Sequence, residues 1–176
     1  MTTLENRLKQ GKDARKKCSR SAQAATGKVT RDPLPLIKRS SEGRIKSLVE
    51  LRYGRMLESP FAFYRGNALL QAHDLAATPN MGLVSTICGD SHLKNFGGFA
   101  TPERNLLFSI NDFEEAHPGP WEWDLKRLVA SFMVAARDLR HDETVEETVC
   151  RQVVGAYQET MLHCAQQSAL ENWYES

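Results

Sequence analysis

The sequence has no apolar run long enough to cross a bilayer, since a membrane-spanning helix needs about 20 consecutive apolar residues. The longest run, Leu128–Ala136, has nine residues and contains Ser131. The basic N-terminus is not followed by an apolar segment, so no secretory signal peptide is visible. These absences exclude a helical membrane protein and predict a cytoplasmic location.

Paired cysteine motifs are also absent. The four cysteines, Cys18, Cys88, Cys150 and Cys164, show no C-x-x-C spacing of the kind that zinc sites and redox motifs use. In a chain without a signal peptide, this pattern favours buried, reduced thiols over disulfides or a zinc site.

An excess of charge of one sign is missing overall, because the net charge is only +1. The charge is nevertheless unevenly divided: residues 1–46 carry 13 Lys or Arg and 4 Asp or Glu, whereas residues 47–176 carry 10 and 18. We interpret the first part as a basic arm that lies over its own acidic domain, with nucleic acid as the alternative partner. One Pro-Gly-Pro-Trp segment is too little aromatic surface for base stacking, so nucleic-acid binding is not favoured.

The pattern of apolar and turn residues predicts a mainly helical α+β protein. Residues 1–30 are polar and are expected to be a loosely ordered arm, and residues 31–176 form one domain. Leu83–Cys88 is apolar and β-branched, which predicts a buried strand. Helices are expected from a cap at Ser40 or Ser41 to Met56, from Pro60 to about Ala77, from Trp121 to about Arg140, and from Glu143 to about Ala169.

A β-hairpin is predicted between two polar residues that suit a divalent cation. Two apolar runs, residues 96–100 and 106–110, flank a Pro- and Asn-bearing turn. If the turn is centred between Glu103 and Arg104, then Phe99 faces Phe108 and Asn95 faces Asp112. Opposed residues lie about 4.5–5.5 Å apart, so both side chains would reach one Mg²⁺.

The spacing of Asp90, Asn95 and Asp112 follows the order of a kinase-type phosphoryl-transfer site. In that interpretation Asp90 orients a substrate hydroxyl, and His92 bonds to the loop or to a phosphate. Taken singly, each residue has a structural explanation, such as an Asx-turn at Asp90. Two further residues, Arg65 and Lys94, are cations that could bind phosphate. Asp124 is expected to cap its helix or to support the Gly89–Asn95 loop.

Two families resemble this pattern. Gly89-Asp90-x-His92-x-x-Asn95, Ile110-x-Asp112-Phe113-Glu114 and Trp123-Asp124-Leu125 are similar to the catalytic and metal loops of aminoglycoside and choline phosphotransferases, which have a protein-kinase-like fold. Ser59–Gly66 and Pro118–Leu128 extend a closer resemblance to the bacterial domain-of-unknown-function family 2252. The resemblance implies Asp90 as the catalytic Asp, Asn95 and Asp112 as metal ligands, Asp124 as loop support, and ATP and Mg²⁺ as cofactors.

One departure bears on activity. Kinases hold ATP with a Gly-rich strand-turn-strand and a Lys, and neither a G-x-G-x-x-G nor a Val/Ala-x-x-Lys strand occurs here. We therefore expect a truncated or split member that acts on an unknown small hydroxylated molecule and is inactive without a partner chain carrying the Gly-rich lobe. The alternatives are a non-catalytic, degenerate binding module and a metallophosphoesterase, whose further His and Asn clusters are not seen.

Overall fold

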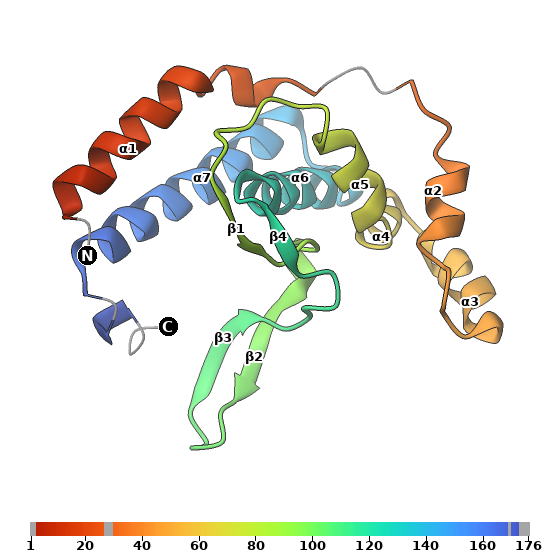
Figure 1. Ribbon diagram of the computed structural model, residues 1–176. Helices are drawn as coiled ribbons and strands as arrows, with labels where there is room; N and C mark the ends of the chain where they lie inside the picture. The colour runs from red at the N-terminus through yellow and green to blue at the C-terminus, as the bar shows by residue number, and fades with distance from the viewer. Residues whose placement is uncertain (1–2, 27–29, 169, 173–176) are drawn as a thin grey trace.

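The computed structural model describes residues 3–26, 30–168 and 170–172, which form a mainly helical α+β protein with two small antiparallel sheets of two strands each (Figure 1). No helix in these ranges is both long and apolar enough to span a membrane. The elements are α1 (Leu4–Lys17), η1 (Ala22–Ala24), α2 (Leu34–Arg39), α3 (Lys46–Met56), α4 (Pro60–Arg65), α5 (Ala68–Leu75), β1 (Val84–Ile87), η2 (Leu93–Asn95), β2 (Phe96–Ala100), β3 (Leu106–Ile110), β4 (His117–Pro120), α6 (Glu122–Asp138) and α7 (Glu143–Gln166).

Helix α6 is the centre of the fold and packs against α4, α5, α7 and η2. Small residues on its buried side allow this close approach, because Ser131 is fully buried and Ala136 nearly so. The connection to α7 is short and well capped: Asp142 accepts a hydrogen bond from the Val145 amide, and Arg137 pairs with Glu146.

Both C-terminal helices form where the sequence predicts them. Helix α6 runs from Glu122 to Asp138, so it starts one residue after the predicted Trp121 and ends two residues before the predicted Arg140. Helix α7 begins at Glu143, as predicted, and ends at Gln166. The expected end of this helix, Ala169, lies outside the described residues.

The helix predicted over residues 60–77 is wrong, because the chain forms two helices that break at Gly66 and Asn67. Ser59 caps α4 and Pro60 opens it, as the sequence indicates. The break follows from tertiary contacts: an added Cβ at Gly66 would lie 2.7 Å from Met56 Cγ, and Arg52 donates a hydrogen bond of 2.5 Å to the Gly66 carbonyl.

The helix expected from Ser40 or Ser41 also differs, because α3 starts only at Lys46. Ser40 instead follows the end of the short helix α2, and its hydroxyl donates to the Ile37 carbonyl. The two serines therefore end one helix, while Ile45 precedes the next without a side-chain cap.

A helix, α1, occupies 14 residues of the segment 1–30 that was predicted as a loosely ordered arm. Thr3 caps its start, and Arg15, Lys16 and Lys17 lie in its last turn, where cations stabilise the helix dipole. Arg7 donates a hydrogen bond to the Ala165 carbonyl, so the start of α1 lies near the end of α7 (Figure 1). Residues 1–2 and 27–29 lie outside the described part.

The prediction of a buried strand at Leu83–Cys88 is wrong for most of its length. Within the described residues strand β1 pairs only with β4, and the first three residues of β1 are exposed. Only Ile87 and the following Cys88 are buried. An apolar, β-branched run predicts a strand, but burial also needs covering elements, and here these cover only its C-terminal end.

The hairpin β2–β3 forms where the sequence predicts it, but the register differs by one residue. Phe99 faces Leu107 instead of Phe108, and the Asn111 amide donates to the Asn95 carbonyl at 3.0 Å. Asn95 therefore pairs with Asn111, and its direct pairing with Asp112 is wrong. The cause is a three-residue turn, Pro102–Arg104, in which Arg104 takes φ of +66°.

Candidate functional site

The candidate site is built around the loop that joins β1 to η2. The loop turns sharply at Gly89, which has φ of +79°. A Cβ at this position would lie 2.4 Å from the backbone oxygen of Glu115, so only glycine fits. The turn directs the next residue, Asp90, toward helix α6.

One face of α6 holds this loop through its backbone. Asp124 accepts hydrogen bonds from the amides of Cys88 (2.7 Å) and Gly89 (3.0 Å), and Ser131 accepts one from Leu93 (2.9 Å). These residues lie on the same side of the helix as Arg127, because residues three, four and seven apart share a face. The sequence interpretation assigned Asp124 to a helix cap or to support of this loop, and the structure places its carboxylate against the loop backbone.

Arg127 holds the carboxylate of Asp90. Its guanidinium is 2% exposed, and both Nε and Nη2 contact Asp90 Oδ1, at 2.6 and 2.5 Å. It also donates to Gln71 Oε1 and to the carbonyl of Tyr64, and it stacks over the Tyr64 ring. Burial raises the pKa of Asp90, while the Arg127 charge opposes this rise. Because both contacts use Oδ1, Asp90 Oδ2 is left for another partner.

The buried amide of Asn95 joins the two acidic residues of the site. Its Nδ2 donates to the backbone carbonyls of Asp90 at 3.0 Å and of Asp112 at 3.3 Å. Its Oδ1 accepts no hydrogen bond from the described residues and is not among their buried unpaired oxygens, so it keeps access to solvent. The segments that carry Asp90 and Asp112 are therefore separated by one amide group.

Asp112 is exposed and lies just beyond the end of β3. Its Oδ1 accepts a hydrogen bond from the Glu114 amide at 3.2 Å, which forms an Asx-turn, and Oδ2 has no hydrogen bond within the described chain. Glu114 in turn contacts Arg44 at 3.3 Å. Asp112 is close enough to Asp90 to contribute to the raised pKa of that carboxyl.

His92 is buried beside Asp90. It is 6% exposed, its Nε2 lies 3.8 Å from Asp90 Oδ2, and its Nδ1 has no hydrogen-bond partner in the described chain. Burial lowers the pKa of His92 to about 4, and the charges of Arg127 and Arg65 act in the same direction. The imidazole is therefore neutral at physiological pH.

The two cations assigned to phosphate binding flank this cluster. Arg65 ends α4, and its exposed guanidinium forms no ion pair with the described residues. Lys94 lies in η2 with its ammonium group 5.9 Å from the centre of the Phe61 ring. The structure thus brings Asp90, His92 and Asn95 together with Asp112 nearby, and both cations remain exposed.

The chemistry of the free atoms suits a hard divalent cation. Asn95 Oδ1 and Asp112 Oδ2 are oxygen donors, and Mg²⁺ prefers one or two carboxylates completed by water and phosphate oxygens. No group of three or more His, Cys, Asp or Glu side chains in the described ranges is arranged to hold a metal. The ligands that a two-metal phosphoesterase needs are therefore not found in this part of the chain.

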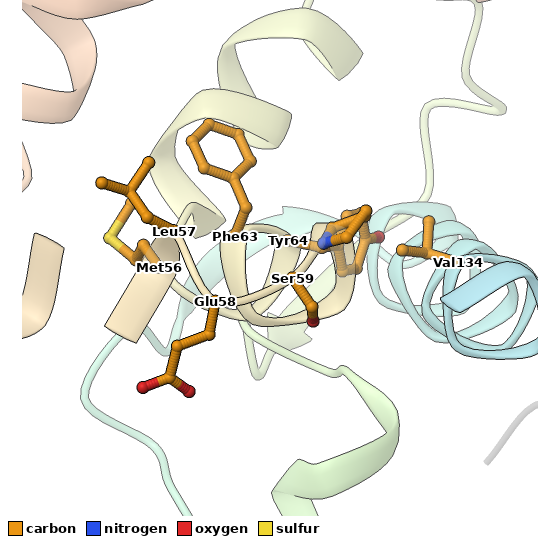
Figure 2. Close-up of a pocket in the computed structure, with 8 residues that line it drawn as sticks. Met56, Leu57, Glu58, Ser59, Phe63, Tyr64 and Val134 are labelled. Carbon is orange, nitrogen blue, oxygen red and sulfur yellow. The ribbon is translucent and has the colours of Figure 1, made fainter. Parts of the chain in front are cut away.

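An open pocket of about 480 Å³ lies next to the site but is not part of it. Figure 2 shows its lining, which comes from the end of α3, the link between α3 and α4, helix α4 and Val134 of α6. Glu58, in the link, is the one charged residue among those that line the pocket. Tyr64 connects the pocket to the site, since its side chain lines the pocket while its carbonyl and ring contact Arg127. Asp90, Asn95 and Asp112 do not line it.

Two residues that position the site were not identified as such from the sequence, Arg127 and Ser131. Each is buried and polar on α6, and with Asp124 they have the spacing i, i+3, i+7 of one helix face. A polar stripe at this spacing inside an apolar helix was the available signal. Its meaning depended on the loop that it faces, which comes from more than 30 residues earlier in the chain.

The fold and the site define a mainly helical α+β protein in which a loop with Asp90 and Asn95 is held on a central helix. The chain belongs to the family described as an uncharacterized protein conserved in bacteria (DUF2252), whose model matches residues 44–176. This confirms the expected resemblance to family 2252, whereas the expected resemblance to kinase-like phosphotransferases stays a prediction. No curated protein and no solved structure matches the chain.

Proposed function

We propose that this chain is the catalytic-loop part of a phosphotransferase-like protein that uses Mg²⁺ and ATP and acts on a small hydroxylated acceptor. One observation carries the proposal: the Asn95 side-chain amide donates to the backbone carbonyls of both Asp90 and Asp112, which holds together the two chain segments that carry these acidic residues. This is the combination of a hydroxyl-orienting carboxylate and oxygen metal ligands that phosphoryl transfer requires.

Each residue has a distinct role in this proposal. Asn95 Oδ1 and Asp112 Oδ2 would hold the cation, and the bound cation would neutralise negative charge on the phosphates. Asp90 Oδ2 accepts a hydrogen bond from the hydroxyl group of the substrate, because Oδ1 is already held by Arg127. His92, which is neutral, hydrogen-bonds to the loop or to a phosphate oxygen, and Arg65 and Lys94 attract the polyphosphate.

A partner chain completes the proposed machinery. This sequence has no Gly-rich strand-turn-strand and no strand lysine with which to hold ATP phosphates. We therefore propose that the chain is inactive alone and needs a second polypeptide to supply that lobe. A kinase-like arrangement of the two parts belongs to this proposal.

A non-catalytic binding module is the second candidate, and the Asp90–Arg127 contact favours it. An Arg that is 2% exposed and contacts one carboxylate oxygen with two nitrogens gives Asp90 a sufficient structural role. In this case the chain binds a nucleotide weakly or only a protein partner, and Asp90 serves the loop rather than chemistry.

Thermal unfolding with and without Mg·ATP tests the first function. At a ligand concentration about tenfold above Kd, binding stabilises the native state by about 1.4 kcal/mol, which raises Tm by roughly 3–5 °C for a chain of this size. We expect Asp112→Ala to abolish this shift, because it removes a metal ligand from an exposed position. Glu103→Ala, which removes an exposed carboxylate at the hairpin tip, is the matched control and keeps the shift.

Two outcomes contradict the proposal. In this proposal the Asn95 and Asp112 oxygens bind Mg·ATP at millimolar concentration even without the Gly-rich lobe, so no stabilisation of the unmodified chain under these conditions favours the non-catalytic module. Equal stabilisation of the unmodified chain and Asp112→Ala places the nucleotide elsewhere on the surface.

A further inference from the structure

Arg52 of α3 is a half-buried cation that has no carboxylate partner among the described residues. Its guanidinium hydrogen-bonds only to neutral groups, the hydroxyls of Ser40 (3.2 Å) and Ser41 (2.9 Å) and the carbonyl of Gly66 (2.5 Å). Burial lowers the pKa of Arg52, and the like charge of Arg44 acts in the same direction. A cation that is removed from water without a counter-ion destabilises a fold, so this position favours an anion.

The neighbours of Arg52 hold its guanidinium in place and leave donors free. Its three hydrogen bonds use one N–H of Nη1 and both of Nη2, so Nε–H and the second Nη1–H have no acceptor within the described chain. The Ser40 hydroxyl is itself fixed by the Ile37 carbonyl at 2.7 Å, and the Ser41 hydroxyl by the Tyr53 hydroxyl at 2.9 Å. The guanidinium is therefore ordered before any ligand arrives, which lowers the entropic cost of binding.

Arg44, in the link between α2 and α3, extends the positive charge toward Asp112. Its Nε donates to the Ser40 carbonyl at 3.1 Å, and its Nη2 lies 3.3 Å from Glu114 Oε1. The Glu114 amide in turn donates to Asp112 Oδ1. Hydrogen bonds and ion pairs thus connect Arg52 continuously to the segment that carries Asp112.

Glu114 is the carboxylate that now pairs with Arg44, and a phosphate could replace it. The two side chains of this pair are 40% and 60% exposed, and an ion pair at such a surface contributes little stability. Phosphate oxygens form charge-assisted, often bidentate hydrogen bonds with arginine. The charges of Glu114 and Glu115 also raise the pKa of Arg52, but they act more weakly than burial and Arg44, which lower it.

Arg65 adds a third guanidinium beside the other two. It directly precedes Gly66, whose carbonyl Arg52 holds, and its exposed side chain forms no ion pair in the described part of the chain. After burial and the charge of Arg127, the charge of Arg65 is the next cause of the lowered pKa of His92. Positive charge therefore reaches from α3 to the loop that carries Asp90.

We propose that Arg52, Arg44 and Arg65 form a binding subsite for a phosphate chain beside Asp112, which we call the arginine subsite. The free N–H groups of Arg52 donate to phosphate oxygens, and the phosphate displaces Glu114 from Arg44. The three arginines then supply the positive charge that kinases obtain from a strand lysine. That the phosphate chain belongs to a nucleotide rests on the proposed function, whereas the subsite itself rests on the contacts of these arginines.

Isothermal titration calorimetry of the whole chain with sodium tripolyphosphate, in the presence of EDTA, tests the subsite without a metal. Arg44→Gln and Arg52→Gln should each weaken binding about tenfold, because each removes charge-assisted hydrogen bonds. The matched control is Arg20→Gln, which removes an exposed arginine that has no ion pair in the described ranges. This control should leave the affinity unchanged.

Glu114→Gln gives a test in the opposite direction. It releases Arg44 but keeps the main-chain amide that bonds to Asp112, so it should strengthen tripolyphosphate binding about threefold. Glu103→Gln, at the exposed hairpin tip, is its control and should change nothing. Glu114→Gln that binds no more tightly than the unmodified chain would contradict the displacement of Glu114.

Circular dichroism identifies variants that do not fold, and if Arg52→Gln is one of these, Arg44→Gln and Glu114→Gln decide. The subsite is overturned if millimolar tripolyphosphate does not bind, if neither arginine variant weakens binding, or if Arg20→Gln weakens it equally. Competition identifies the source of the phosphate: metal-free ATP that displaces tripolyphosphate supports a nucleotide, and ATP that does not displace it overturns that assignment.

The failure of the subsite is distinguishable from that of the proposed function. A Tm shift with Mg·ATP that Arg44→Gln and Arg52→Gln leave unchanged would overturn the arginine subsite alone. Binding of tripolyphosphate that depends on these arginines, without any Tm shift by Mg·ATP, would support the subsite and contradict the proposed function.

Discussion

At the scale of single residues, Gly89 decides where Asp90 points. Its φ of +79° and the backbone oxygen of Glu115, 2.4 Å from the place of a Cβ, leave no room for any other residue. Both effects act in the folded state, so a substitution costs strain and also moves the residue that follows.

We therefore expect Gly89→Ala to lower the free energy of unfolding by about 2–4 kcal/mol, from left-handed strain plus the backbone clash. Gly82→Ala is the matched control: its φ is +72°, but nothing lies within 4 Å of the added Cβ. This control should lose only about 1–2 kcal/mol. Urea unfolding measures both, and equal losses would show that the Glu115 contact does not matter.

His92 makes the stability of the folded protein depend on pH in the acidic range. Burial lowers the pKa of His92 in the folded state to about 4, from the ordinary 6.5. The unfolded chain therefore binds a proton between these values while the folded chain does not. The stability that neutral His92 contributes is present above pH 6.5 and is lost as the pH falls through about 4.

We expect the free energy of unfolding to fall by on the order of 3 kcal/mol across this window because of His92. In His92→Gln this part of the fall should disappear, since glutamine does not titrate. Urea unfolding at intervals between pH 7 and pH 4 measures the difference, and parallel pH profiles for the two proteins would refute it.

At the scale of elements, one helix face organises the site. Asp124, Arg127 and Ser131 of α6 contact the β1–η2 loop at Cys88, Gly89, Asp90 and Leu93. The loop has no regular structure of its own before η2, so its backbone amides depend on the helix for their hydrogen bonds. The conformation of the loop therefore depends on its hydrogen bonds to α6.

Asp124→Ala should cost about 2–4 kcal/mol, because two buried amides lose charge-assisted acceptors. Asp124→Asn keeps one acceptor oxygen and should lose about half as much. Hydrogen exchange of the Cys88 and Gly89 amides gives a local reading: both should exchange faster in Asp124→Ala. Unchanged protection at these amides would mean that the loop is held by Arg127 and Ser131 alone.

At the scale of the whole molecule, the chain covers its surface poorly. Folding buries about 56% of the surface that the unfolded chain exposes, whereas a compact domain of roughly this size buries about 70%. Large apolar residues remain exposed on α3, β1 and the hairpin, among them Leu48, Val84 and Leu106. The fold therefore packs around α6 but leaves much apolar surface exposed to solvent.

This openness should appear in the denaturant dependence of unfolding. The slope m scales with the surface exposed on unfolding, so the monomer should show an m-value about four-fifths of that usual for a compact domain of this length. Urea unfolding at several protein concentrations measures the m-value. A full-sized m-value would mean that the monomer buries more surface than this structure does.

Predictions from the sequence are confirmed where the physical cause is local. Ser59-Pro60 starts α4, Glu143 starts α7, and the Pro102-containing turn joins two strands, because caps and turn residues act on their near neighbours. The register, by contrast, was wrong by one residue. It depends on whether Arg104 enters the left-handed region, and sequence pattern alone did not decide that.

The residues and their spacing are sufficient to indicate the family, the mainly helical class and the order of Asp90, Asn95 and Asp112 along the chain. They do not indicate that Arg127 holds Asp90, that β1 stays largely exposed, or that the hairpin presents an uncovered apolar face, all of which depend on the packing of the folded chain. Propensity and capping act within a few residues, whereas burial and ion pairing depend on which distant segments come into contact.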